Sequence, residues 1–247
     1  MLTYNVQHYP VGLDRLIAFI RSQNADLIFL QENSRDRTGP TDQARQIAAA
    51  LGGLNVVSAT TLGLPREQDC DQAILSRFEL TDGKALVLDS GGRTFAVRAT
   101  AKIEDRRLAV VSVHTHATFR LKMEHITQSS DARLREVSTL LEEIRATDMD
   151  VLAAGDFNAS PWMPEYYGLT RVLTDLGLVS KDAKLSFPSH KPNVRIDYVF
   201  GRGGFTGRSY EVGTVQLSDH RPVIAEIDWA SDRRSSPQPT TANSTRP

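Results

Sequence analysis

The chain has 247 residues, of which 40% are hydrophobic and 24% are charged, a composition typical of a globular protein. No apolar run approaches the roughly 20 residues that a membrane-spanning helix needs, and the single cysteine, Cys70, excludes an internal disulfide and a cysteine-based zinc site. The formal net charge is −1; segment 231–247 has three arginines and one aspartate, a net +2, which leaves −3 on residues 1–230. This charge argues against binding nucleic acid through bulk electrostatics, although a local basic patch or a bound cation would still permit it.

Residues 1–230 are expected to form one domain, because a single layered domain reaches roughly 250 residues. The remaining stretch, 231–247, is rich in Ser, Pro, Thr and Arg without an apolar period, which predicts a disordered tail. No signal peptide is visible, so the sequence as given predicts a cytoplasmic protein, while a start clipped at the first strand would leave secretion open. We expect the chain to act as a monomer.

Short strand patterns alternate with amphipathic helix patterns along the chain. Apolar residues at three- and four-residue spacing predict helices at 12–23, 43–51, 130–145 and 166–176. Runs rich in β-branched and other apolar residues predict strands at 2–6, 25–30, 54–58, 73–76, 95–103, 108–113, 151–154, 194–200, 210–215 and 222–229. The strand-turn-strand pattern around 95–113 begins at Lys84, and the last three strands are expected to complete a second set.

The chain is organised around the stretch 150–161, which reads DVLAAGDFNASP. Alternate residues of an extended chain point the same way, so Asp156 and Asn158 are expected to face one pocket while Phe157 turns into the core. A carboxylate and an amide at the end of a strand can position a water and bind a phosphate oxygen. The same residues also suit a plain strand-to-loop exit, because Asp and Asn favour turns.

Several other predicted strands end in residues of the same chemical kind. The polar strand-end residues are Asn5, Glu32, His114, Asp156 with Asn158, Asp197, and Asp219 with His220. So many carboxylate, amide and imidazole groups predict that the strand ends converge on one site. Carboxylates and amides suit Mg²⁺ or Mn²⁺, and histidines can act as acid, base or oxyanion stabiliser. Four carboxylates in one pocket would repel one another unless a cation or protons intervene.

Seven short motifs carry a family resemblance over residues 2–229. In chain order they are TYNV, LQEN, AILSR, VHTH, GDFNASP, RIDYVF and LSDHRPV. In this order they resemble the endonuclease/exonuclease/phosphatase superfamily, which includes pancreatic-type deoxyribonucleases, inositol polyphosphate 5-phosphatases and bacterial sphingomyelinases. The resemblance implies a deoxyribonuclease I-like fold, a four-layered α/β/β/α sandwich of two packed mixed β-sheets with helices outside. It also implies metal-dependent cleavage of phosphate esters.

Carried over position by position, the resemblance assigns binding of Mg²⁺, or of Mn²⁺, to Asn5, Glu32 and Asp219. His220 would be the general base, and Asp197 would be hydrogen-bonded behind it. A carboxylate in that place fixes the tautomer of the imidazole and raises its proton affinity. A structural salt bridge with the nearby Arg195 is the alternative role for Asp197.

The remaining assignments concern the water and the substrate. Asp156 would align the attacking water, Asn158 would bind the scissile phosphate, and His114 would stabilise charge that develops on the phosphate oxygens. His116 and Arg77 are candidate substrate contacts, with a surface ion pair as the alternative for Arg77. We further expect the catalytic strand ends to be reached by solvent, so that replacing these residues costs little stability.

The resemblance leaves the substrate open. The sequence predicts a divalent-metal-dependent phosphodiesterase or endonuclease, with a phosphatase, a sphingomyelinase-like lipid-headgroup phosphodiesterase and a non-catalytic phosphate-binding module as alternatives. Nucleic acid and phospholipid headgroups are therefore both candidate partners. Gln7 stands where apurinic endonucleases carry an aspartate, which argues against that branch, and no long basic insertion for gripping duplex DNA is present. His8, His125 and His190 belong to no motif and are expected at the surface.

Overall fold

The computed structural model describes residues 1–8, 10–33, 43–63, 72–89, 94–118, 122–182 and 184–229. Cys70 and the predicted tail at 231–247 lie outside these ranges. The helices are α1 (Leu13–Gln23), α2 (Gln43–Ala50), α3 (Met123–Arg145), α4 (Pro164–Thr170) and the short 3₁₀ helix η1 (Leu176–Val179). None of the helices in the described ranges is long and apolar enough to cross a membrane.

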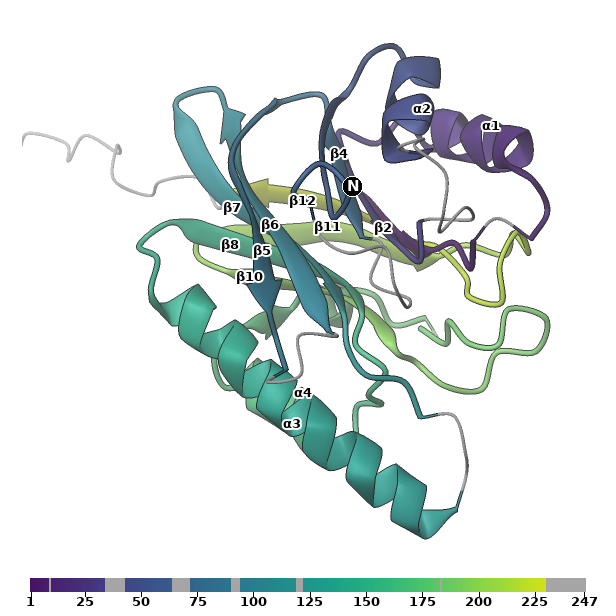
Figure 1. Ribbon diagram of the computed structural model, residues 1–247, viewed down its shortest axis with the longest axis vertical. Helices are drawn as coiled ribbons and strands as arrows, with labels where there is room; N and C mark the ends of the chain where they lie inside the picture. Colours follow the sequence, from purple (N-terminus) through teal and green to yellow (C-terminus); the bar gives the residue numbers. More distant parts are fainter. Residues whose placement is uncertain are drawn as a thin grey trace, which may run out of the picture.

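Twelve strands form two six-stranded sheets that lie face to face (Figure 1). Sheet A contains, in spatial order, β11 (Phe205–Val212), β12 (Val223–Trp229), β1 (Leu2–Asn5), β2 (Leu27–Gln31), β4 (Ala73–Ser76) and β3 (Asn55–Ser58). Sheet B contains β5 (Glu79–Val87), β6 (Phe95–Ile103), β7 (Arg106–His114), β8 (Asp150–Asp156), β10 (Asp197–Arg202) and β9 (Thr174–Asp175). Both sheets are mixed, because β1 runs parallel to β2 and β7 runs parallel to β8.

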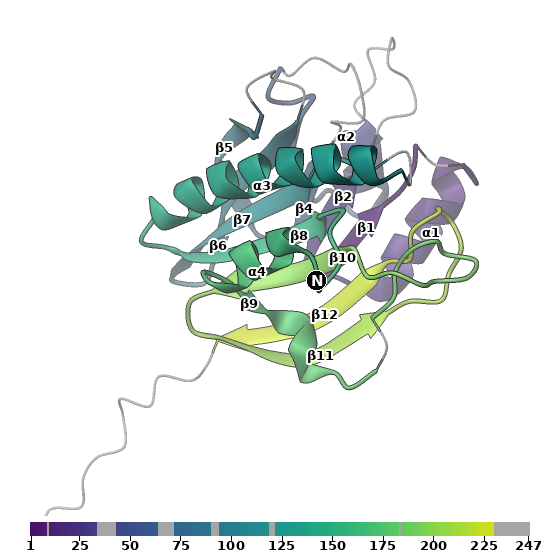
Figure 2. The same cartoon turned by 90° about the horizontal axis from the view of Figure 1, so that it is seen from below.

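Three apolar layers hold the molecule together, and they follow from the alternation of side chains along each strand. In β2, Leu27 and Phe29 point into the space between the sheets, whereas Ile28 and Leu30 point outward to α1 and α2. On the other side of the molecule, α3 packs its apolar stripe on the outer face of sheet B (Figure 2). The order helices, sheet A, sheet B, helices confirms the predicted four-layered sandwich.

The C-terminal strands differ from the sequence prediction, because they do not complete a second set. Strand β10 pairs with β8 in sheet B, whereas β11 and β12 extend sheet A. Strand β12 pairs antiparallel with β1, with Thr3 opposite Val223. The two ends of the described chain are therefore neighbours in one sheet. The chain crosses from sheet B to sheet A between β10 and β11, and the segment that carries Asp219 and His220 joins β11 to β12 within sheet A.

Two helix predictions need correction. Helix α3 begins at Met123, seven residues before the predicted start, because its first turns are largely exposed and carry no apolar period. The predicted helix at 166–176 ends at Thr170, and β9 and η1 follow it. Asp175 begins η1, since its Oδ1 accepts a hydrogen bond from the backbone N–H of Gly177 at 2.9 Å. The predicted start of one strand is also wrong: β5 begins at Glu79 rather than at Lys84. Its residues are largely exposed, and apolar and polar side chains do not alternate along it.

Arg202 closes the C-terminal end of α3, where helix carbonyls lack partners within the helix. Its guanidinium donates to the carbonyl oxygens of Ile144 at 2.5 Å and of Met149 at 2.9 Å. Replacing Arg202 by Met should lower the free energy of unfolding by about 1–3 kcal/mol, because it leaves these acceptors unpaired. Arg145→Met, an exposed arginine in the last turn of the same helix, should change it by less than about 0.5 kcal/mol. Urea unfolding of both variants measures the difference, and equal losses would contradict the prediction.

Candidate active site

Three of the predicted site residues form a row across sheet B. His114 at the end of β7 is the register partner of Asp156 at the end of parallel β8, and Asp156 is the partner of Asp197 at the start of antiparallel β10. Residues in register on neighbouring strands share a face of the sheet. The fold therefore brings these side chains together although they are far apart in the sequence.

Sheet A contributes Asn5 and Glu32 to the same site. Asn5 ends β1, and its Nδ2 donates to Glu32 Oε1 at 2.9 Å and to Asp156 Oδ2 at 3.2 Å. The second of these bonds joins the ends of the two sheets. Glu32 directly follows β2 and has a φ of 51°, a left-handed conformation that is uncommon for residues other than glycine. This turn ends β2 at the point where the Glu32 carboxylate accepts the hydrogen bond from Asn5.

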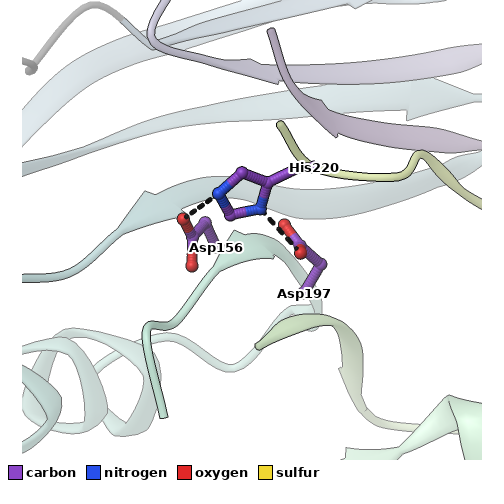
Figure 3. Close-up of side chains that lie close together, drawn as sticks. All are labelled: Asp156, Asp197 and His220. Atoms are coloured by element: carbon purple, nitrogen blue, oxygen red, sulfur yellow. Dashed lines mark hydrogen bonds and ion pairs between the residues drawn. The ribbon is translucent and has the colours of Figure 1, made fainter. Parts of the chain in front are cut away.

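His220 lies between two carboxylates, as Figure 3 shows. Its Nδ1 is 2.9 Å from Asp197 Oδ2, and its Nε2 is 3.5 Å from Asp156 Oδ2. Arg195, the alternative partner for Asp197, instead donates both terminal nitrogens to Asp175 at 2.7 Å each. The geometry is thus that of a histidine with an orienting carboxylate on one nitrogen and a second carboxylate near the other.

The GDFN stretch adopts a turn, and the side chain of Phe157 enters the core as predicted. Phe157 is 1% exposed and packs edge-on against the ring of Phe200. Asp156 Oδ1 accepts the backbone N–H of Asn158 at 2.9 Å, and Asn158 Nδ2 donates to the carbonyl oxygen of Thr115 at 3.0 Å. The stretch is therefore a turn as well as a part of the site, so the two interpretations of the sequence describe one structure.

His114 faces the carboxylates rather than an apolar core. Its Nε2 is 3.7 Å from Asp156 Oδ2 and 3.8 Å from Glu32 Oε1, and its side chain is 9% exposed. Asp156 Oδ2 consequently has two imidazoles close to it, that of His114 at 3.7 Å and that of His220 at 3.5 Å. Positive imidazoles near a carboxylate favour its charged form.

Burial and mutual charge set the proton affinities of the site. Burial raises the pKa of Asp156, the charge of Asp197 raises it further, and His220 opposes both effects. Burial also raises the pKa of Asp219, with an added contribution from the charge of Glu32. For His220 burial acts to lower the pKa, but the charges of Asp197 and Asp156 outweigh it and raise that pKa to about 10. The site thus carries more negative charge than its histidines offset.

This donor set fits a divalent cation of the Mg²⁺ type, which prefers carboxylate and amide oxygens. Glu32 and Asp219 bring the carboxylates, and burial raises the pKa of Asp219 with a smaller contribution from the charge of Glu32. Asn5 is less direct, because its Nδ2 donates to Glu32 and its Oδ1 accepts the backbone N–H of Gln7 at 3.1 Å. In this arrangement Asn5 orients the carboxylates.

A second group also has the spacing of a metal site. Within the described ranges, one group of His, Cys, Asp or Glu side chains has ligand atoms that all lie within 4.8 Å of one another. This group consists of Asp156, Asp197 and His220. The hydrogen bond between His220 and Asp197 accounts for much of this closeness. A cation held there would have to displace that bond, so we keep Glu32, Asp219 and Asn5 as the candidate metal residues.

Solvent reaches the central residues less than the sequence suggested. Asp156 is 1% exposed and His220 is 5% exposed, so neither occupies an open strand end. The premise that solvent reaches these strand ends is therefore wrong, and we now expect replacement of either residue to cost stability, because removing one member of a buried charged pair leaves the other uncompensated.

The two predicted substrate contacts differ in position. His116 is exposed two residues after His114, and its backbone N–H donates to Glu136 Oε2 at 2.8 Å, which fixes the chain at the edge of the site. Arg77 follows β4 at the opposite end of sheet A and pairs with Asp26 at 3.2 Å. Strand β4 is antiparallel to β2, so it carries Arg77 toward the start of β2 and away from Glu32. We therefore remove Arg77 from the site.

Sequence reasoning missed the contribution of His8. Its Nε2 is 3.5 Å from Glu32 Oε2, and its backbone N–H donates to the carbonyl oxygen of Glu32 at 3.0 Å. Gln7, His8, Glu32 and Asn158 all have left-handed backbone conformations. Such conformations often gather at functional sites. No motif signalled His8, because its approach to Glu32 depends on the turn after β1.

Solved structures of other proteins share this fold. Solved structures similar to most of the chain include a functionally unknown conserved protein from Enterococcus faecalis V583 (19% identity, 93% of this chain, 100% of that chain, TM-score 0.74). A second is an endonuclease/exonuclease/phosphatase from Bacteroides vulgatus (17% identity, 93% of this chain, 98% of that chain, TM-score 0.73). A third is a mannosyl-6-phosphatase from Bacteroides thetaiotaomicron VPI-5482 (17% identity, 92% of this chain, 98% of that chain, TM-score 0.70). At these identities the likeness shows a shared fold.

No curated protein sequence matches the chain significantly. The sequence model of the Endonuclease/Exonuclease/phosphatase family, however, matches residues 2–220, which contain every residue of the site described above. The resemblance carried by the seven motifs is thereby confirmed. The chain belongs to the Endonuclease/Exonuclease/phosphatase family.

Proposed function

We propose that the protein is a divalent-metal-dependent hydrolase of phosphate esters, and more specifically a phosphodiesterase. The observation that carries the proposal is the position of His220, with Asp197 2.9 Å from Nδ1 and Asp156 3.5 Å from Nε2. The second carboxylate distinguishes this site from a His–Asp pair with a purely structural role. A water hydrogen-bonded to Nε2 would also contact Asp156.

His220 and Asp156 would activate the water together. Asp197 accepts a hydrogen bond from Nδ1–H, which leaves Nε2 as the nitrogen that takes a proton from the water. As the water oxygen bonds to phosphorus, its proton passes to Nε2 and the ester P–O bond breaks. Asp197 then stabilises the imidazolium, and the leaving oxygen acquires a proton from solvent. General base catalysis of this kind contributes on the order of 10²–10⁴-fold.

His114 and Asn158 would hold the phosphate. His114 Nε2 lies 3.7 Å from Asp156 Oδ2, and its imidazole would donate to a phosphate oxygen. Asn158 is held by two hydrogen bonds at the turn after β8, so its side chain is preorganised. Donors fixed in advance stabilise developing charge without the cost of reorganisation.

Glu32 and Asp219, with Asn5 as their orienting neighbour, would hold Mg²⁺ or Mn²⁺. A bound cation would supply positive charge that favours the neutral form of His220 and offsets charge on the phosphate. The residue types support this role, because carboxylate and amide oxygens are the ligands that such cations prefer. The neutralising charge would explain how so many carboxylates share one pocket.

The substrate class has two main candidates. A diester, from nucleic acid or from a phospholipid headgroup, carries one negative charge and suits a site whose own residues are mostly acidic. A phosphate monoester is the second candidate, because a structural neighbour with the same fold is a mannosyl-6-phosphatase. A comparison of bis(p-nitrophenyl) phosphate with p-nitrophenyl phosphate in Mg²⁺ separates the two. Faster turnover of the monoester would overturn the diester assignment.

Replacing Glu32 by Gln should weaken the dependence on the metal. The amide keeps the shape of the side chain but loses the charge that attracts a divalent cation. We expect the Mg²⁺ concentration for half-maximal activity to rise at least tenfold. Glu79→Gln, at the exposed start of β5, is the control and should leave the titration unchanged. An unchanged titration for Glu32→Gln would mean that this residue is not a ligand.

A further inference from the structure

A short hairpin at 186–194 precedes β10 and belongs to none of the groups assigned above. Phe187 and Val194 pair antiparallel across it. The backbone N–H of Ser186 donates to the carbonyl oxygen of Val194 at 2.9 Å, and Val194 donates back to Phe187 at 3.1 Å. The hairpin is therefore a defined element, and it stands immediately before the segment that carries Asp197.

The first side of the hairpin fixes Asp197. Ser186 is 0% exposed, and its Oγ lies 3.3 Å from the backbone nitrogens of both Ile196 and Asp197, which donate to it. Buried backbone N–H groups need an acceptor, and the serine hydroxyl supplies it. The position of the Asp197 backbone thus depends on one side chain in the hairpin.

The hairpin also fixes the residues on either side of His220 in the sequence. The backbone N–H of Arg221 donates to the carbonyl oxygen of Ser186 at 2.8 Å. The backbone N–H of Ser189 donates to the carbonyl oxygen of Asp219 at 2.6 Å, and Ser189 accepts a bond from Arg221 Nε at 2.9 Å. The residues immediately before and after His220 are both bonded to the hairpin.

The ring of Phe187 covers the histidine itself. Its centroid is 4.9 Å from that of the His220 imidazole, with 49° between the ring planes. A ring packed on the imidazole face restricts rotation of the side chain. Asp197 begins a strand of sheet B and His220 leads into a strand of sheet A, so their mutual position depends on a contact between the sheets.

We propose that the 186–194 hairpin is a clamp that sets the geometry of the His220–Asp197 pair, with Ser186 as its main positioning residue. The hairpin bonds Asp197 on one side and the neighbours of His220 on the other, so it joins the two halves of the pair. This inference rests on the proposed function, in which His220 is the base. Its role is distinct from catalysis because Ser186 acts through other residues.

The test compares Ser186→Ala with two matched variants of the full chain. Ser186→Thr keeps the hydroxyl. Ser58→Ala removes another buried serine hydroxyl that accepts a backbone N–H, from Thr61 at 3.1 Å, in sheet A. The readouts are kcat and KM for bis(p-nitrophenyl) phosphate in Mg²⁺, and the proton NMR resonance of His220 Nδ1–H, identified by its absence in His220→Ala.

We expect Ser186→Ala to lower kcat about tenfold with KM unchanged and to shift or broaden the Nδ1–H resonance. Ser186→Thr should recover most of kcat, and Ser58→Ala should change neither readout. Unchanged kcat and resonance in Ser186→Ala would overturn the clamp. If the wild-type protein has no turnover, the proposed function fails and the resonance alone decides on the clamp. If Ser186→Ala does not fold, Ser189→Ala takes its place, because it removes the bond that Ser189 Oγ donates to the carbonyl oxygen of Ser218 at 2.6 Å, with the same expected and contradicting results.

Discussion

Replacing His220 by Asn is expected to lower kcat for a phosphodiester by about 1,000-fold while the fold is kept. The asparagine Nδ2 can stand in for Nδ1 and donate to Asp197, so the buried carboxylate retains a partner. The amide has no counterpart of Nε2, and it cannot take a proton from water. Steady-state kinetics together with circular dichroism separate loss of the base from loss of structure.

Two further variants sharpen this result. His220→Ala should lose the activity and also several kcal/mol of stability, because it leaves Asp197 buried without a partner. His125→Ala, near the start of α3, should affect neither quantity. If His220→Asn kept more than a tenth of the wild-type kcat, another group would have to be the base.

Replacing Gly155 by Ala is expected to destroy the fold around the site. Gly155 has a φ of 151°, and an added Cβ would lie 1.9 Å from the carbonyl oxygen of Val113. Val113 and Gly155 are register partners on parallel β7 and β8, so relief of the clash would separate these two central strands. We expect a loss of more than about 4 kcal/mol, a large part of the total stability of a typical domain.

Gly204→Ala is the matched control for this prediction. An added Cβ there meets no heavy atom within 4 Å, and the position lies in the turn between β10 and β11. Its thermal unfolding midpoint should stay within a few degrees of the wild-type value. A soluble Gly155→Ala protein with a near-normal midpoint would show that the two strands can adjust, contrary to the rigid pairing described above.

The site could be predicted largely from the sequence because its residues stand at strand ends. His114, Asp156 and Asp197 each sit next to a clear apolar run, and the register of sheet B then aligns them. The sandwich followed from the seven motifs, whose order matches that of the strands that carry them. These sequence signals are local, and the fold brings the residues that carry them together at one edge of the sandwich.

Other features depend on contacts that no local pattern reports. His8 reaches Glu32 through a left-handed turn, and Arg77 leaves the site because β4 runs antiparallel to β2. The burial of His220 could not be predicted, because the Phe187 ring that packs on it lies in a hairpin without a helix or strand periodicity. The first turns of α3 were missed because exposed helical residues carry no apolar stripe.

The measurement that tests the central claim most directly is the hydrolysis of bis(p-nitrophenyl) phosphate by the purified full chain, in Mg²⁺ and in EDTA, with His220→Ala beside it. We predict turnover in Mg²⁺ that is lost both in EDTA and in the variant. Turnover that persists in EDTA would contradict the metal site at Glu32 and Asp219. Turnover that persists in His220→Ala would contradict the assignment of His220 as the base, and with it the account of how this site cleaves phosphate esters.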